Sequence, residues 1–245
     1  MTTHPFTRVD GRVAIDRTAL GLAPLPVSYI TCVGRNYAEH AKEMKSDLPE
    51  RPMLFTKNPA SCVLSGEPIV IPAICRDREQ VDYEGELAIV IGRACKDVSE
   101  TDALDPAGPV LGLCVANDVS ARWWQKEGAG GQFVRGKSFD TFCPVGPHVT
   151  PLASIPDPNR LNLKTTLSGE PVQRASTADM IFPLARLIAE CSAGTTLLPG
   201  SLILTGTPAG VGHGQTPPRY LTPGDTVRVE IEGLGAIENP VTAEG

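Results

Sequence analysis

The sequence predicts a β-rich α+β domain. Short runs of β-branched and other apolar residues recur along the 245 residues, and turn residues, including 24 glycines and 23 prolines, separate them. Helical patterns are few, at 37–43 and near 183–191. The length suits one large domain, so we expect a short leader with a hairpin-like piece over residues 1–25 and a single domain over residues 26–245.

The first half of the chain supplies most of the predicted strands. Its apolar runs predict strands over 27–33, 53–57, 68–72, 81–91 and 110–116. Asn36, just beyond the first run, is positioned to cap the helix over 37–43. Further along, glycines at 127–132 predict a flexible connector, and turn residues punctuate 143–147.

The second half continues the pattern with strands at 161–167 and 202–204. A tight turn at 168–169 follows the first of these. An apolar stripe predicts the helix near 183–191, and Gly194 lies just past its end. The run 226–232 alternates like a half-exposed antiparallel strand, and a last short strand should follow it.

Composition excludes several classes of function. The net charge of -6 and the pI near 5.3 argue against a nucleic-acid or anionic-membrane partner. No apolar run is long enough to span a bilayer, and the first residues lack a signal pattern. Seven cysteines without a Cys-x-x-Cys spacing indicate reduced core residues, with neither disulfides nor a zinc site. We therefore expect a cytoplasmic protein.

Two glutamates open the predicted strand at 81–91. Side chains two residues apart in a strand point to the same face, so Glu84 and Glu86 should share one face. The run is apolar on both faces, which is typical of a buried strand, and two buried like charges repel each other. A hard cation such as Mg²⁺, Mn²⁺ or Ca²⁺ removes that conflict. The alternative is a strand end at the surface, with both acids in water.

A third acid, Asp118, follows the predicted strand at 110–116. The end of a buried strand is a suitable place for a third metal ligand. Asn or Asp at such a position is equally common as a helix cap or turn residue. Both interpretations stay open for Asp118 on the sequence alone.

His40 and Glu43 lie three residues apart on the predicted helix and so share a face. A carboxylate beside an imidazole fixes its tautomer and raises its basicity, as a general base requires. A solvated charged helix face is the simpler alternative. Lys137 is either a solvated lysine or a cation directed at an anionic substrate or enolate. The loop 205–212 exposes backbone N–H groups and the Thr207 hydroxyl, which together can hold a carboxylate. The alternative is that its glycines only form tight turns.

Six motifs occur in a fixed order: 33–37 with His40, 82–86, 117–122, 136–140, 176–182 and 205–212. Through them the sequence resembles the fumarylacetoacetate hydrolase family over about residues 27 to 240. The resemblance implies a β-rich, mixed-sheet β-roll of the family's C-terminal domain type, so that residues 26–245 form a catalytic domain. It also implies a homodimer.

The resemblance further implies roles for particular residues. It implies Mg²⁺ or Mn²⁺ held by Glu84, Glu86 and Asp118. It places a catalytic His–Glu dyad at His40 and Glu43, on a segment that forms a lid over the substrate. The remaining implied site residues are a catalytic Lys137 and the substrate-binding Arg122, Gln125 and Thr207.

The substrates implied by this resemblance are small 2-oxo acids. The first hypothesis is a metal-dependent hydrolase that cleaves a C–C bond in acylpyruvate-like 2,4-dioxo acids, such as fumarylpyruvate or acetylpyruvate, through a metal-bound pyruvate enolate. Oxaloacetate decarboxylation and isomerisation of a 2-hydroxymuconate-type diacid pass through the same enolate and are the alternatives. A non-catalytic protein that binds a metal and a 2-oxo acid is the alternative of another class.

Overall fold

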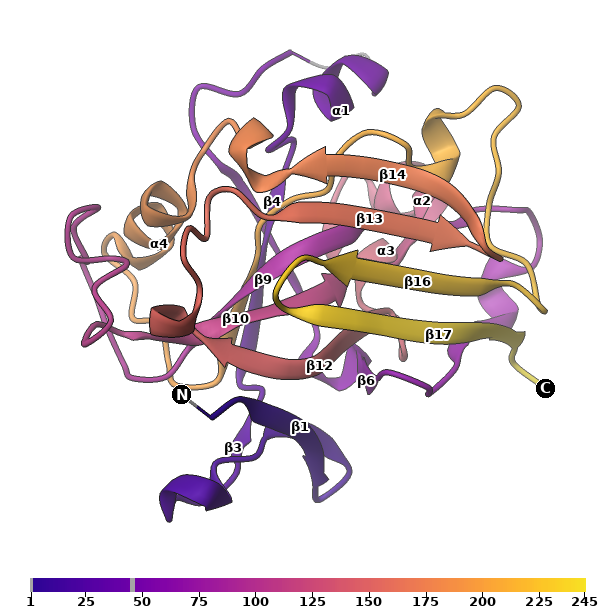
Figure 1. The fold of residues 1–245 in the computed structure, drawn as a ribbon. Helices are drawn as coiled ribbons and strands as arrows, with labels where there is room; N and C mark the ends of the chain where they lie inside the picture. The colour runs from indigo at the N-terminus through magenta and orange to yellow at the C-terminus, as the bar shows by residue number, and fades with distance from the viewer. Residues whose placement is uncertain (1, 45–46) are drawn as a thin grey trace.

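Two mixed β-sheets form the body of the molecule, as a computed structural model shows (Figure 1). The structure describes residues 2–44 and 47–245. In this part of the chain the larger sheet has ten strands, in the order β3 (Leu25–Pro26), β2 (Arg12–Ile15), β1 (His4–Val9), β12 (Cys143–Pro151), β10 (Val110–Asn117), β9 (Gly85–Ile91), β15 (Ser201–Leu204), β4 (Tyr29–Gly34) and β5 (Met53–Lys57), with β6 (Cys62–Leu64) paired to β12.

The second sheet has five strands among the described residues, in the order β14 (Glu170–Ser176), β13 (Asn162–Leu167), β16 (Thr226–Ile231), β17 (Gly235–Ala243) and β7 (Ile69–Ile71). It lies across β9, β10 and β12 of the larger sheet (Figure 1). A separate pair joins β8 (Val81–Asp82) to β11 (Ser120–Ala121).

The helices are short and lie around the sheets (Figure 1). The α-helices are α1 (Ala38–Glu43), α2 (Arg122–Gln125), α3 (Phe133–Lys137) and α4 (Leu184–Ser192). Single 3₁₀ turns occur at η1 (Thr18–Leu20), η2 (Pro59–Ser61), η3 (Ala73–Cys75), η4 (Glu127–Ala129), η5 (Leu152–Ser154), η6 (Thr177–Asp179) and η7 (Gly212–Gly214). None of the described helices has the length and hydropathy that a bilayer crossing requires.

Strand β9 runs through the centre of the fold. It pairs antiparallel with β10 on one side and with β15 on the other. Its odd positions, represented by Leu87 and Ile89, pack in the core between the sheets. Ala88 and Val90 pack in a second core on the opposite face. This confirms that the apolar run after Glu86 is buried on both sides, and it makes β9 a rigid support for its N-terminal end.

Most predicted strands are present, but the one predicted over 81–91 is interrupted. β8 ends at Asp82 and pairs with β11, and β9 begins only at Gly85. The prediction treated one apolar run as one strand, whereas its first residues pair with a different neighbour. The predicted connector at 127–132 contains the 3₁₀ turn η4, and it lies between two helices, α2 and α3, that the sequence did not reveal.

The segment at 143–147 is strand rather than turn, which corrects its interpretation. It begins β12, which pairs with β10 and, over its first residues, with β6. Proline lacks the N–H that a ladder needs, but Pro147 lies where the register against β10 shifts and has no registered partner. The seven cysteines are all free, as predicted.

Asn36 does not cap helix α1, since Tyr37 occupies the N-cap position and makes no side-chain cap. The Asn36 amide instead donates to the carbonyls of Phe182 (3.1 Å) and Thr205 (2.8 Å). Its oxygen accepts the Phe182 N–H at 2.8 Å. Asn36 is fully buried, so it joins three distant segments where local sequence suggested only a cap.

Replacing Asn36 should therefore destabilise the fold strongly. Asn36→Ala leaves three buried backbone groups without partners, so the free energy of unfolding should fall by about 2–4 kcal/mol. Urea unfolding followed by circular dichroism measures it. Asn162→Ala is the matched control, because the Asn162 amide donates to Glu232 at the surface. Equal losses in the two variants would contradict the joining role of Asn36.

Candidate active site

Three acidic side chains meet at the end of the central strands. One oxygen of each of Glu84, Glu86 and Asp118 lies within 4.8 Å of the others, and all three residues are buried. The register of β9 and β10 explains this, because Glu86 pairs with Ala116 and the chain reaches Asp118 two residues later. The Asp118 N–H then donates to the Glu84 carbonyl at 2.8 Å. The alternative of two glutamates in water is wrong.

Gly85 separates the glutamates for a steric reason. A Cβ at this position would collide with Thr165 Oγ1 of the second sheet. The Gly85 N–H donates to Gln173 Oε1 at 3.0 Å, and its carbonyl accepts the Thr207 hydroxyl at 3.0 Å. The close approach of the two sheets at this point holds the glutamates in place.

Three buried cations surround the acids. Lys137 Nζ lies 2.7 Å from both Glu84 Oε2 and Asp118 Oδ2. Arg122 donates to Glu84 Oε1 at 2.6 Å and binds Asp82 Oδ2 through two nitrogens, at 2.6 and 2.9 Å. Lys57 donates to Asp118 Oδ1 at 2.6 Å. The predicted Lys137 and Arg122 are thus held among carboxylates, and neither is solvated.

Charge and burial shift the pKa values of the two glutamates in opposite directions. Burial alone would raise the pKa of Glu84, but the adjacent charges of Lys137 and Arg122 outweigh it and lower that pKa to about 2. Glu86 accepts the Gly206 N–H at 2.7 Å and has no ion pair among the described residues. Burial, followed by the charges of Asp118 and Glu84, raises the pKa of Glu86 well above its ordinary value.

This donor set fits a divalent metal ion. Four buried carboxylates, including Asp82, face three buried cations, so the cluster carries one negative charge in excess when Glu86 is ionised. Oxygen donors alone favour a hard ion such as Mg²⁺ or Mn²⁺. A dication would offset the repulsion that Glu86 experiences from Asp118 and Glu84. It would also leave the cluster with a net positive charge, which suits an anionic ligand.

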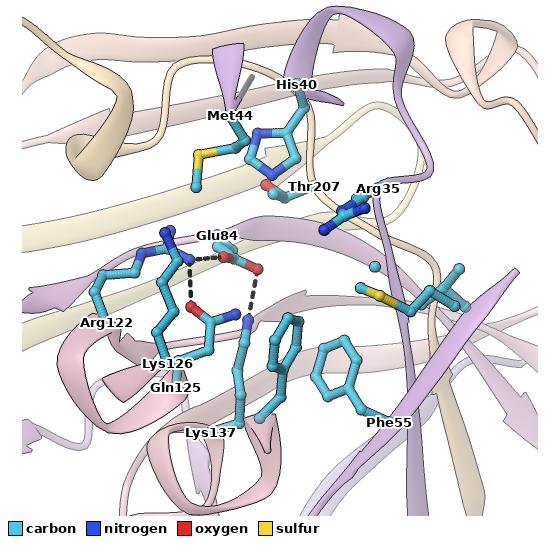
Figure 2. A pocket seen from close by; sticks show the side chains of 14 residues that line it. Arg35, His40, Met44, Phe55, Glu84, Arg122, Gln125, Lys126, Lys137 and Thr207 are labelled. Atoms are coloured by element: carbon cyan, nitrogen blue, oxygen red, sulfur yellow. Dashed lines mark hydrogen bonds and ion pairs between the residues drawn. The ribbon is translucent and has the colours of Figure 1, made fainter. Parts of the chain in front are cut away.

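Helix α1 carries His40 and Glu43 over the acidic cluster, with Figure 2 showing the imidazole directed toward Glu84. His40 Nδ1 lies 3.0 Å from Glu43 Oε2. The other Glu43 oxygen accepts the Gly210 N–H at 2.9 Å, and a Cβ at Gly214 would collide with the Glu43 carboxylate. The loop at 210–214 therefore holds Glu43 against His40. The structure does not support a solvated helix face here, because His40 is buried.

A pocket of about 200 Å³ lies between α1 and the acids (Figure 2). Six of the predicted site residues line it: His40, Glu84, Arg122, Gln125, Lys137 and Thr207. The Thr207 hydroxyl donates to the Gly85 carbonyl and accepts from Gln173 at 2.8 Å. Gln125 Oε1 accepts from Arg122 at 3.1 Å. Glu43, Glu86 and Asp118 are not among the lining residues, although each lies within reach of one that is.

Sequence reasoning missed the supporting residues Lys57 and Asp82. A lysine at the end of an apolar strand was the available signal for Lys57, but its partner Asp118 is 61 residues away. Asp82 accepts from Arg122 and from the N–H groups of Gly212 (2.8 Å) and His213 (2.9 Å). Asp82 thus ties the arginine to the loop that holds Glu43.

Comparisons with known proteins agree with this architecture. The family described as fumarylacetoacetate (FAA) hydrolase C-terminal matches residues 29–242. Oxaloacetate tautomerase fahd2, mitochondrial, from Xenopus laevis is 45% identical over 86% of this chain and 65% of its own length. Oxaloacetate tautomerase YisK from Bacillus subtilis is 43% identical over 89% of this chain and 71% of its own length. The chain therefore spans about two thirds of these curated relatives.

Solved structures show the same fold. A 5-carboxymethyl-2-hydroxymuconate delta-isomerase from Mycobacterium smegmatis has a TM-score of 0.79 and 38% identity, with 99% of this chain and 94% of that chain covered. A fumarylacetoacetate hydrolase from Exiguobacterium antarcticum has a TM-score of 0.82 and 35% identity, with both chains fully covered at 100%. The predicted mixed-sheet fold is confirmed as the β-rich half-barrel of this family. This chain belongs to the fumarylacetoacetate hydrolase family.

Proposed function

We propose that the protein is a divalent-metal-dependent keto–enol tautomerase of a small 2-oxo acid, with oxaloacetate as the first candidate substrate. The observation that carries the proposal is the His40–Glu43 dyad facing the acidic cluster across one pocket. The names of two relatives at 43–45% identity, both oxaloacetate tautomerases, support the substrate. Proton abstraction beside a carbonyl is accelerated where a base faces a charge-stabilising group, so the position of the dyad opposite the acids supports the proposal.

Glu84, Glu86 and Asp118 would hold Mg²⁺ or Mn²⁺. A bound dication supplies Lewis-acid stabilisation for negative charge on the 2-oxo oxygen of the substrate. Lys137, which already lies between Glu84 and Asp118 and lines the pocket, adds a second fixed positive charge. The Arg122–Asp82 pair keeps Glu84 in position.

His40 would act as the base. Its Nδ1 lies 3.0 Å from Glu43 Oε2, so the tautomer with its proton on Nδ1 would donate to Glu43 and present Nε2 to the pocket as the acceptor. The C3–H bond of the keto acid breaks, the proton goes to Nε2, and the electron pair forms the C2–C3 double bond. The 2-oxygen then takes a proton from solvent to give the enol, and His40 loses its proton to complete the cycle. The reverse sequence gives the keto form.

Hydrolysis of an acylpyruvate is the second candidate. The same dyad can deprotonate a water molecule instead of C3, and one structural relative is a fumarylacetoacetate hydrolase. Decarboxylation of oxaloacetate is less well supported, because loss of CO₂ needs no such base. A protein that only binds a metal and an oxo acid would not require a histidine oriented by a glutamate, as His40 is by Glu43. Enol–keto conversion of oxaloacetate and pyruvate release from acetylpyruvate, measured in parallel, separate the two candidates.

The cytoplasmic location and the homodimer, which we expect from the sequence and its resemblance, remain predictions. The names of some relatives include a mitochondrial location. Size-exclusion chromatography with light scattering would determine the oligomeric state.

His40 should be needed for proton transfer and not for folding. In His40→Ala, kcat for oxaloacetate tautomerisation should fall by about 10²–10⁴-fold with KM changed little, because only the base is lost. Enol absorbance in the ultraviolet, in the presence of Mg²⁺, measures the rate. His148→Ala is the control, because His148 lies on β12 outside the pocket. A His40→Ala enzyme as fast as His148→Ala would overturn the proposed base.

Glu86→Gln should separate metal binding from folding. Burial and the charges of Asp118 and Glu84 raise the pKa of folded Glu86, so its charged form opposes folding above the unfolded pKa. The free energy of unfolding at neutral pH in EDTA should therefore rise in this variant. Affinity for Mn²⁺ should fall by at least about tenfold, because a charged ligand is lost.

Urea unfolding in EDTA and calorimetric titration with Mn²⁺ measure the two effects. Glu230→Gln on the exposed face of β16 is the control and should change neither. A Glu86→Gln protein that binds Mn²⁺ like the wild type would contradict the assignment of Glu86 as a ligand.

A further inference from the structure

Four basic side chains other than His40 line the pocket, and they fall into two classes. Arg122 and Lys137 are buried and bound to carboxylates at 2.6–2.7 Å. Arg35 and Lys126 form no ion pair with the described residues. Figure 2 shows these two on opposite sides of Glu84, with Arg35 toward His40 and with Lys126 beside Arg122. The pocket therefore carries cationic charge that the protein itself does not neutralise.

The Lys126 side chain has a hydrogen-bonding neighbour, whereas the Arg35 side chain has no such neighbour among the described residues. Lys126 Nζ lies 3.4 Å from His213 Nε2, and His213 Nδ1 lies 2.6 Å from the Tyr220 hydroxyl. The guanidinium of Arg35 makes no hydrogen bond with any described residue, although the residue is only half-buried at the pocket wall. A guanidinium without partners in a pocket is a binding group for a planar anion, because its fork matches a carboxylate with two parallel hydrogen bonds.

The backbone holds Arg35 at this place. Its φ of 57° is left-handed, a conformation that arginine rarely adopts. Gly34 before it packs against Met53, where a Cβ would collide with the Met53 side chain. Asn36 after it is fixed by Phe182 and Thr205. Because both neighbours are fixed, the chain reverses at Arg35 and directs its side chain into the pocket (Figure 2).

We propose that Arg35 binds the distal carboxylate of a dicarboxylic 2-oxo acid and thereby sets the preference of the enzyme for dicarboxylates. The inference rests on the proposed function and names its substrate class. The 1-carboxylate and 2-oxo group face the acidic cluster, and the second carboxylate lies toward the β4–α1 corner, where Arg35 meets it. Met53, which packs against Gly34, and Phe55 are apolar lining residues of the same pocket, and they offer no hydrogen-bond partner to a carboxylate, whereas Arg35 does.

The test compares oxaloacetate with its 4-methyl ester, which keeps the 2-oxo acid end and loses the distal charge. Arg35→Met should lower the preference for the free acid, as the ratio of kcat/KM values, by about 10- to 100-fold, the value of one charge-assisted carboxylate pair. The loss should fall mainly on KM, and Arg35→Lys should recover part of it. Arg35→Gly relaxes the left-handed backbone and should lose the preference as Arg35→Met does.

Lys126→Met is the matched control, since it removes the other unpaired cation and should retain the preference for the free acid. Loss of the preference in Lys126→Met, or its survival in both Arg35→Met and Arg35→Gly, would overturn the assignment. A structural role for Arg35 would change Tm in Arg35→Met and leave the preference ratio intact.

A binding measurement keeps this inference separate from the proposed reaction. Mn²⁺-loaded protein is titrated with oxalate, which has no distal carboxylate, and with oxaloacetate. Arg35→Met should weaken the binding of oxaloacetate by about 10- to 100-fold relative to the binding of oxalate. A wild type without turnover would refute the tautomerase and leave this ratio measurable. An unchanged ratio in an active enzyme would refute the role of Arg35 alone.

Discussion

The structure depends on one electrostatic balance, in which buried carboxylates at the ends of β9 and β10 are held together by buried cations. Like charges this close repel strongly in a poor dielectric, and each charge removed from water also costs desolvation energy. Lys137 and Lys57 bind Asp118 from two sides, while Arg122 bridges Glu84 to Asp82. Glu86 has no cationic partner among the described residues, and for this reason the cluster is suited to a divalent cation.

The fold positions these buried carboxylates at the ends of its most rigid strands. Glu86 lies in β9 and Glu84 immediately precedes it, and this strand has partners on both sides and apolar cores on both faces. His40, the proposed base, lies on a six-residue helix outside the sheets, and side-chain contacts fasten this helix to the rest of the fold. Glu43 connects that helix to the 210–214 loop, and Asp82 connects the loop to Arg122. The base and the acids are thus positioned by one continuous set of hydrogen bonds.

The parts of the site that sequence could predict are those that local geometry determines. Glu84 and Glu86 meet as the two-residue spacing predicted, although Glu84 lies just before the first residue of β9, and His40 meets Glu43 because a helix repeats. Lys57 could not be predicted, because it reaches Asp118 only after β5 has paired with β4 at the sheet edge. Asn36 resembles a helix cap until Phe182 and Thr205 arrive from 146 and 169 residues away. The strand at 143–147 was hidden by prolines that the irregular ladder of β12 tolerates.

The corner between β4 and α1 has a particular consequence for specificity. Arg35 and His40 lie five residues apart on this one segment, so the group proposed to bind the far end of the substrate and the proposed base share a single support. In the proposed function the acidic cluster would bind the near end from a different support, the central sheet. The distance between those two supports would then set the length of the substrate that fits. A change at position 35 can alter which acid is accepted without disturbing the ion pairs of Glu84 and Asp118, because Arg35 takes part in none of them.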